Sequence, residues 1–319
     1  MWKQTWSWTS SEIQFHYHEE RLLQRLMSIR RYLGLWPLAM VLLVAAWQTA
    51  IAEDPYFVTD HHHLPEAGNL AISNYSVLGT PKSGNGFLGS QMEFEYRIAK
   101  WWATQVQFDG QTTWNDSTIF TGYSWTNKFK LYPSNRWLNS AFVISWEDGN
   151  AADKSLAEIE GHGTEEDFAL SNSVTKKIHE HEVEMKLIVS RDYKGWNFAW
   201  NFMTAKSLAA GPWKWGYSLG TNRPLSAADG NGHCVFCRRS MSAGLEFYGG
   251  LGDSSSFGPQ RTPQYLGPEM SWKLSERAAV KAGPHFGLTP ASQHVLMHFA
   301  VVYEIPHFNK SVRKILHGD

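Results

Sequence analysis

Apolar and polar residues alternate through most of the chain. In GWNFAWNFMTA (195–205), aromatic residues occupy every second position from Trp196 to Phe202, and Asn197 and Asn201 are among the residues between them. A period of two is typical of a β-strand, whose successive side chains point to opposite faces of a sheet. The same alternation recurs in QMEFEYRI, HEVEMKLIV, WKWGYSLG, LGPEMSWKL and HVLMHFAVVYEI. The chain is therefore predicted to be all-β.

Twelve segments of this kind are predicted as strands: 70–79, 90–98, 101–109, 118–127, 140–148, 180–190, 195–205, 213–221, 241–249, 265–274, 277–287 and 294–305. Each is close to the ~9–11 residues with which a tilted strand crosses a bilayer, and longer than most strands of soluble sheets. The tight connections, after the second, sixth and tenth strands, lie on one side of an up-and-down arrangement. The connections after the fourth and eighth strands, on that same side, are long. Residues 149–179 leave room for another hairpin, so fourteen strands are the alternative.

Composition distinguishes a membrane barrel from other all-β folds. The 319-residue chain is 14% aromatic and contains 16 Trp, yet its mean hydropathy is -0.37. This combination excludes a bundle of membrane helices and suits strands with an apolar face toward lipid and a polar face toward a wet lumen. A soluble sandwich would bury mostly Val, Ile and Leu on shorter strands. We therefore predict an antiparallel up-and-down transmembrane β-barrel.

Polar residues on the faces opposite the apolar ones are assigned to the lumen. Because they carry both signs of charge, they can pair across neighbouring strands. The formal net charge of -1 gives no basic field that would attract nucleic acid. The residues assigned to the lumen are Glu93, Glu95, Arg97, Gln105, Gln107, Glu182, Glu184, Lys186, Asn197, Asn201, Lys214, Glu246, Glu269, Lys273, Lys281, His298 and Glu304.

Residues 27–52 have the three parts of a secretory signal peptide. Arg30 and Arg31 precede an uncharged apolar run, and Ala50 and Ala52 form an A-x-A arrangement after it. A retained membrane anchor is the alternative, because the uncharged stretch approaches the ~20 residues of a spanning helix. The sequence thus predicts an exported protein with a cleaved signal.

The rest of the chain is divided around the predicted barrel. The segment before the signal is interpreted as an upstream extension of the true start, or else as a short amphipathic helix. The predicted division is 1–26 upstream extension, 27–52 signal peptide, 53–69 N-terminal periplasmic arm, 70–305 outer-membrane barrel and 306–319 C-terminal periplasmic tail.

No residue is assigned to catalysis. A hydrolase on this scaffold would need a nucleophile or activated water with a His held by a carboxylate or amide. His298 and Glu304 share a strand face but are separated by about 20 Å along an extended strand. Ser292 and His294 are close in one loop, which is far more often chance than a dyad. No enzyme activity and no cofactor are predicted.

Two motifs resemble metal sites. The run His61–His63 is interpreted as a solvated part of the arm, because only two adjacent side chains of an extended chain can share a face. Cys234 and Cys237 are the only cysteines, and in an exported protein a disulfide between them is favoured over zinc. No metal ligand is assigned.

The final third, GPEMSWKLSERAAVKAGPHFGLTPASQHVLMHFAVVYEIP, resembles the closing hairpins of bacterial outer-membrane β-barrel proteins. The chain after the signal resembles uncharacterised porin-like barrels of that class. The resemblance implies an outer-membrane location, with membrane lipid and small solutes as partners. One departure is HFNKSVRKILHGD after Tyr303, where such barrels often end at an aromatic residue.

These observations favour a porin-like channel or transporter for small solutes. Two alternatives remain: a metal-handling or adhesive barrel that acts through its loops, and an exported soluble β-sandwich that binds a ligand. The motifs are architectural, so they predict a fold more than an activity.

Cleavage is expected between Ala52 and Glu53, because small residues follow the apolar run there. Amino-terminal sequencing of the protein recovered from membranes should therefore begin at Glu53. A mature start upstream of Leu43 would contradict the cleaved signal.

Overall fold

The alternating segments form one closed sheet. The computed structural model describes residues 55–80, 85–132, 137–154, 170–225 and 240–317. The predicted upstream extension, the signal peptide and the pair Cys234 and Cys237 lie outside these residues.

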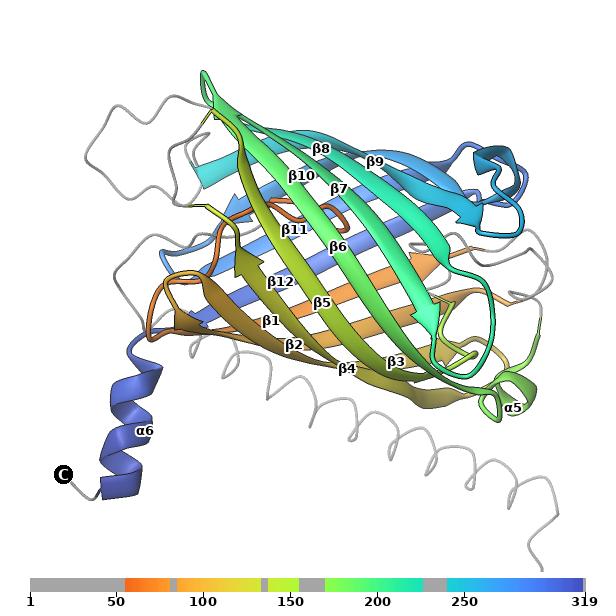
Figure 1. Ribbon diagram of the computed structural model, residues 1–319, viewed down its shortest axis with the longest axis horizontal. Helices are drawn as coiled ribbons and strands as arrows, with labels where there is room; N and C mark the ends of the chain where they lie inside the picture. Colours follow the sequence, from red (N-terminus) through yellow and green to blue (C-terminus); the bar gives the residue numbers. More distant parts are fainter. Residues whose placement is uncertain (1–54, 81–84, 133–136, 155–169, 226–239, 318–319) are drawn as a thin grey trace, which may run out of the picture. The chain divides into compact units, whose positions relative to one another are not determined.

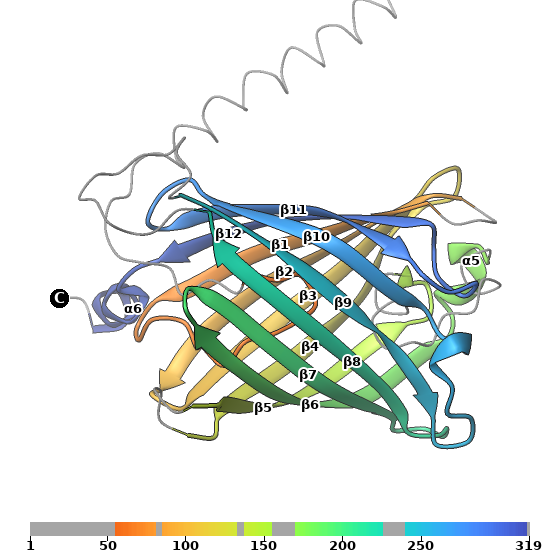
Figure 2. The same ribbon diagram turned by 90° about the horizontal axis from the view of Figure 1, so that it is seen from above.

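Twelve antiparallel strands make the barrel, each paired with its neighbours in the chain, and β1 closes it against β12 (Figures 1 and 2). The strands are β1 (Leu70–Gly79), β2 (Phe87–Ala99), β3 (Trp102–Thr113), β4 (Thr118–Lys130), β5 (Asn139–Asn150), β6 (His179–Tyr193), β7 (Trp196–Ser207), β8 (Lys214–Pro224), β9 (Met241–Asp253), β10 (Gln264–Lys273), β11 (Ala278–Gly287) and β12 (Val295–Ile305). Closure satisfies the backbone donors and acceptors of every strand within the wall, which a membrane requires.

The prediction of twelve strands is confirmed, and every predicted segment overlaps one observed strand. The fourteen-strand alternative is wrong. Within the described part of the connection between β5 and β6, the structure has a single-turn helix, α5 (Asn172–Thr175), and no strand. The barrel closes without an additional hairpin.

The outer face of the barrel carries the aromatic residues. Trp196, Phe198 and Trp200 on β7 are 37%, 45% and 43% exposed, whereas Asn201 on the same strand is 0% exposed. An exposed apolar belt over a closed sheet is stable in lipid and costly in water. The alternation therefore places lipid outside and polar groups inside, and the fold is a transmembrane β-barrel.

The two ends of the barrel differ, and we call the end where β1 begins and β12 ends the terminal end. The connections β2–β3, β6–β7 and β10–β11 lie there and are short. In the β6–β7 turn, Tyr193 pairs with Trp196, and Lys194 and Gly195 between them have φ of 51° and 79°. Two central residues with positive φ match the tight hairpin turn whose twist suits antiparallel strands.

Short helices lie at both ends. Helix α6 (Phe308–His317) follows β12 at the terminal end, and η2 (Pro259–Arg261) and α5 lie in connections at the opposite end (Figure 1). Among the described residues, no helix has the length and apolar character needed to cross a membrane.

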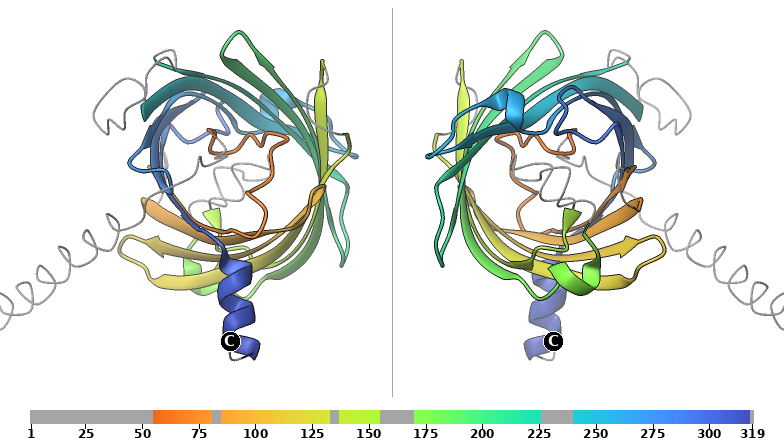
Figure 3. Two further views of the ribbon diagram at one scale, coloured as in Figure 1. Left: turned by 90° about the vertical axis from the view of Figure 1, so that its left-hand side faces the viewer. Right: turned by 90° about the vertical axis from the view of Figure 1, so that its right-hand side faces the viewer.

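The predicted periplasmic arm does not extend away from the barrel. Its described part, residues 55–69, which we call the luminal segment, folds inside the ring of strands (Figure 3). Tyr56 and His62 are both 1% exposed, so this part of the chain is covered by the wall. The polar groups of the wall bind it, as described below.

Candidate functional site

The buried carboxylate of Glu246 on β9 is the main anchor of the luminal segment. Its oxygens accept hydrogen bonds from three consecutive backbone N–H groups: those of Phe57 (3.2 Å), Val58 (2.8 Å) and Thr59. Consecutive N–H groups that converge on one anion form a nest that compensates its charge. Glu246 is 0% exposed, so the segment supplies the solvation that water would otherwise give.

Asp60 joins the segment to three further strands. Its backbone N–H donates to Asn201 Oδ1 at 2.6 Å, and Asn201 Nδ2 donates back to the Asp60 carbonyl at 2.9 Å. The Asp60 carboxylate lies 2.8 Å from Lys186 Nζ on β6 and 3.9 Å from Lys128 Nζ on β4. The Asn201 side chain thus forms with Asp60 the two backbone hydrogen bonds that a residue of a neighbouring strand would form.

Tyr56 is held at the other side of the nest. Its hydroxyl donates to Asn197 Oδ1 at 2.7 Å, and its carbonyl accepts from Lys281 Nζ at 2.7 Å. A Cβ added to Gly220 on β8 would lie only 2.5 Å from the Tyr56 ring. The absence of a side chain at Gly220 therefore makes room for the ring.

Part of the lumen is filled by an apolar core. Val58 belongs to a buried cluster with Val77, Phe87, Tyr248, Tyr265 and Leu296, all from the wall. Phe57 packs against this cluster, and its ring centroid lies 5.8 Å from that of His285 and 5.2 Å from that of His298. Sequence reasoning expected a wet lumen, but here inward apolar groups bury Val58 and partly cover Phe57.

A polar cavity of about 220 Å³ lies beside the segment. Its lining carries six carboxylates, from Asp60, Glu93, Glu95, Glu147, Glu184 and Glu304. Two lysines of the lining, Lys128 and Lys186, oppose them. Carboxylates therefore outnumber basic groups around this space.

The residues assigned to the lumen from the sequence fall into several environments. Glu93, Glu95, Gln105, Gln107, Glu184, Lys186 and Glu304 line the cavity. Arg97, Asn197, Asn201, Glu246, Lys281 and His298 contact the luminal segment, and Glu304 also accepts a hydrogen bond from Asn69. The conduction role of these residues stays a prediction.

The remaining four assigned residues belong neither to the lining of the cavity nor to the contacts of the segment given above. Glu182 and Lys214 form an ion pair of 3.1 Å. Glu269 is buried and accepts from Asn222 Nδ2 at 3.1 Å. Lys273 is exposed at the last position of β10. An inward-facing position in the alternation does not by itself place a side chain beside the cavity, since the position of the residue along the barrel axis also matters.

Sequence reasoning missed Tyr248 and His285, which link the wall to Phe57. His285 Nδ1 and His298 Nε2 each lie 3.2 Å from the Tyr248 hydroxyl. The inward glycines were the available signal in the sequence. A Cβ added at Gly267, for example, would collide with the His285 ring. Inward glycines on β8 to β11 therefore indicate that other side chains fill the lumen beside these strands.

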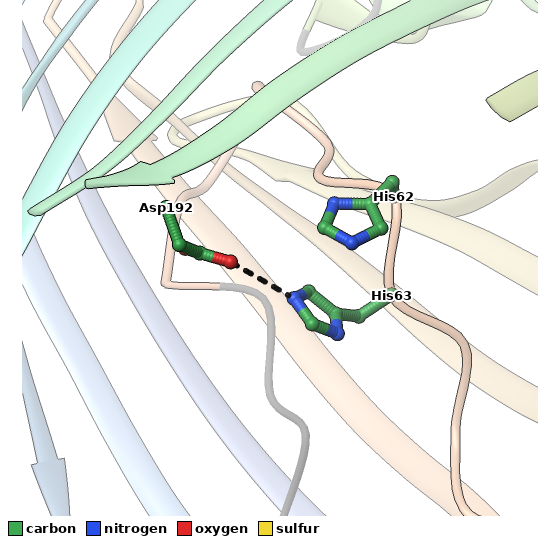
Figure 4. Close-up of side chains that lie close together, drawn as sticks. All are labelled: His62, His63 and Asp192. Carbon is green, nitrogen blue, oxygen red and sulfur yellow. Dashed lines mark ion pairs between the residues drawn. The ribbon is translucent and has the colours of Figure 1, made fainter. Parts of the chain in front are cut away.

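Two of the three histidines in the run are buried instead of solvated, contrary to the interpretation of the run as part of an exposed arm. His61 and His62 are 6% and 1% exposed. His62 Nδ1 shares a 2.6 Å hydrogen bond with Ser190 Oγ on β6, while His63 approaches Asp192 near the end of that strand (Figure 4). Burial, with the neighbouring His63, lowers the pKa of His62 to about 3, so the ring is neutral at neutral pH.

The serine–histidine pairs do not have the arrangement of a hydrolase site. The carboxylate of Asp192 is paired with His63, not with the His62 ring that contacts Ser190. Ser292 Oγ accepts from the Gln264 N–H at 2.8 Å and donates to its carbonyl at 2.9 Å. These hydroxyls hold segments of the chain together.

Comparisons with known proteins place the fold among bacterial outer-membrane β-barrels. The structure is similar to the COG4313 outer membrane channel from Pseudomonas putida F1, with a TM-score of 0.50 and 9% identity, covering 79% of this chain and 100% of that chain. Omp33 of Acinetobacter baumannii is also matched, with a TM-score of 0.36 and 10% identity over 75% of this chain and 100% of that one. No protein-family model and no curated protein matches the sequence. The likeness to the Pseudomonas channel shows a shared barrel fold.

Replacing the anchor should loosen the luminal segment without opening the wall. In Glu246→Gln one oxygen becomes an NH₂ group and the charge is lost, so part of the nest loses its acceptor. We expect docking to weaken by about 1–3 kcal/mol. Hydrogen exchange at the amides of residues 57–59 should then accelerate by about 5- to 150-fold.

Glu269→Gln is the matched control, because Glu269 is a buried carboxylate on the adjacent strand that bonds Asn222. It should leave exchange at residues 57–59 unchanged. Both variants should still migrate differently with and without boiling, as folded barrels do. Equal exchange in wild type and Glu246→Gln would show that the carboxylate does not hold the segment.

Proposed function

We propose that the protein is an outer-membrane channel for small hydrophilic solutes, in which the luminal segment narrows the passage. The observation that carries this proposal is the cavity inside the barrel, which is lined by charged and polar side chains and bordered by Asp60 of the segment. A polar interior has no role in anchoring a barrel in lipid, whereas it suits the passage of water and solutes. The fold shared with an outer-membrane channel agrees with this proposal.

The terminal end of the barrel is proposed to face the periplasm. Short turns are usual on that side of bacterial barrels, and three of the connections at the terminal end are short. The luminal segment enters from the same end, because Asn69 immediately precedes β1. Its amide donates to Glu304 at 2.9 Å, near the end of β12. The segment would therefore control entry from the periplasmic side.

The passage is proposed to favour cations. The excess of carboxylates over lysines in the lining gives a negative potential, and low-dielectric walls concentrate it. Lys186 mainly compensates two of the six carboxylates, because it pairs with Asp60 and lies 3.6 Å from Glu184.

Neutralising two carboxylates of the lining should reduce the preference for cations. At about 8 Å in a watery passage, each fixed charge interacts with an ion by about 0.5 kcal/mol, with opposite signs for cations and anions, and screening over about one Debye length reduces this interaction to about 0.2 kcal/mol. For Glu93→Gln with Glu95→Gln, we therefore expect the cation-to-anion permeability ratio to fall about two- to fivefold. Reversal potentials in planar bilayers under a salt gradient measure this ratio.

The control carries Glu180→Gln and Glu276→Gln, which remove two carboxylates outside the cavity lining, one near each end of the wall. It should keep a ratio closer to that of the wild type. A conducting Glu93/Glu95 variant with an unchanged reversal potential would exclude the cavity from the ion path. Absence of conductance from well-folded wild-type protein would contradict the channel itself and favour a function in the loops.

A further inference from the structure

Three metal-binding side chains meet where the luminal segment touches β6. His62, His63 and Asp192 each offer one ligand atom, and these atoms lie within 4.8 Å of one another (Figure 4). His63 Nε2 is 3.7 Å from Asp192 Oδ2, and the ring centroids of His62 and His63 are 4.0 Å apart. The group joins two residues of the segment to one of the wall.

Neighbouring side chains orient two of the three ligands. Ser190 Oγ occupies Nδ1 of His62 at 2.6 Å, which leaves Nε2 as the ligand atom of this ring. Asn197 Nδ2 donates to Asp192 Oδ1 at 2.6 Å, which leaves Oδ2 directed to His63. Hydrogen bonds that fix the second nitrogen of a ligand imidazole and the second oxygen of a ligand carboxylate are typical of metal sites.

We propose that His62, His63 and Asp192 bind a divalent transition-metal ion such as Zn²⁺ or Co²⁺, with water completing the coordination. Two imidazoles and one carboxylate form a ligand set that suits zinc and related ions. Ca²⁺ and Mg²⁺ are disfavoured because they require oxygen ligands.

Binding requires the ligands to move closer together. Metal bonds of about 2.0–2.2 Å place tetrahedral ligand atoms about 3.3–3.6 Å apart, so the longest separation must shrink by roughly 1 Å. The side chains of His63 and Asp192 are 38% and 58% exposed and have room to rotate. His62 is buried and keeps its place against Ser190. The site thus has one fixed ligand and two adjustable ones.

A metal ion at this position would tether the luminal segment to β6. The hydrogen bond of His62 to Ser190 already holds the segment there, and coordination adds a link to Asp192. The site and the tether do not depend on whether the barrel conducts solutes.

Metal binding can be measured on the intact protein in detergent, purified through a tag without histidine and freed of metal with a chelator. Co²⁺ should give one tight equivalent with the visible absorption of a nitrogen- and oxygen-ligated ion, and Zn²⁺ should displace it. His63→Gln and Asp192→Asn should each weaken Co²⁺ binding by at least about tenfold, since even outer partners of ligands contribute that much.

His181→Gln is the matched control, because His181 Nδ1 lies 3.5 Å from Asp148 Oδ1 in another histidine–carboxylate pair of the wall. It should bind Co²⁺ as the wild type does. Equal affinity in the wild type, His63→Gln and Asp192→Asn, all retaining the heat-dependent mobility of a folded barrel, would overturn the site.

Hydrogen exchange tests the tether separately from metal binding. Zn²⁺ should slow hydrogen exchange in residues 56–64 of the wild type by about tenfold, and it should leave His63→Gln unchanged. Tight binding that depends on His63 but does not slow exchange would support the site and contradict the tether.

Discussion

A carboxylate buried inside a membrane barrel must find its partners within the protein, and for Glu246 those partners are three backbone N–H groups of the luminal segment. A buried charge without such partners would cost several kcal/mol. The N–H groups of the segment would face the same problem, because they leave water without joining a strand. The carboxylate and the N–H groups therefore provide each other's hydrogen-bond partners, and these hydrogen bonds determine where the segment lies in the lumen.

The other contacts of the segment act around that nest. Lys281 binds the Tyr56 carbonyl, Asn201 pairs with the backbone of Asp60, and Phe57 packs against the buried apolar cluster. These contacts come from strands on several sides of the barrel, so the segment is held across the lumen instead of along one strand. Most are polar and individually modest, and a segment held in this way can undock without breaking the wall, whose hydrogen bonds are independent of it.

The strands of the wall could be predicted from the sequence because alternation depends only on residues that are close together in the chain. A period of two fixes which side chains face lipid, and the length of each alternating run fixes a strand, so twelve strands were predicted at nearly their observed bounds. The segment follows no such period. Its partners are remote in the chain: the hydrogen bonds to Glu246 span up to 189 residues, and those to Asn201 span 141. The residues of PYFVTDHHHLPEAGN alone do not reveal these remote partners, and the stretch was therefore predicted to be an exposed arm.

The same distinction explains the candidate site. Glu93 and Glu95 were assigned to the interior by alternation and line the cavity, whereas Lys273 has the right parity but lies at the exposed end of its strand. Asp192 was not considered as a ligand because its proximity to His63 arises only when the segment folds inward. The inward position of Gly220 was the available hint, since a small residue facing a lumen leaves space for another chain.

The most direct test of this account is the single-channel conductance of the wild type against a variant that combines Glu246→Gln with Tyr56→Gly, Phe57→Gly and Val58→Gly. This variant keeps the length of the chain and the barrel wall, but it loses the charged acceptor of the nest and the side chains that hold the segment in the core. The account predicts a larger conductance for the variant in symmetrical salt. Heat-dependent mobility in electrophoresis should show that both proteins are folded. Equal conductance would contradict the claim that the docked segment limits the passage.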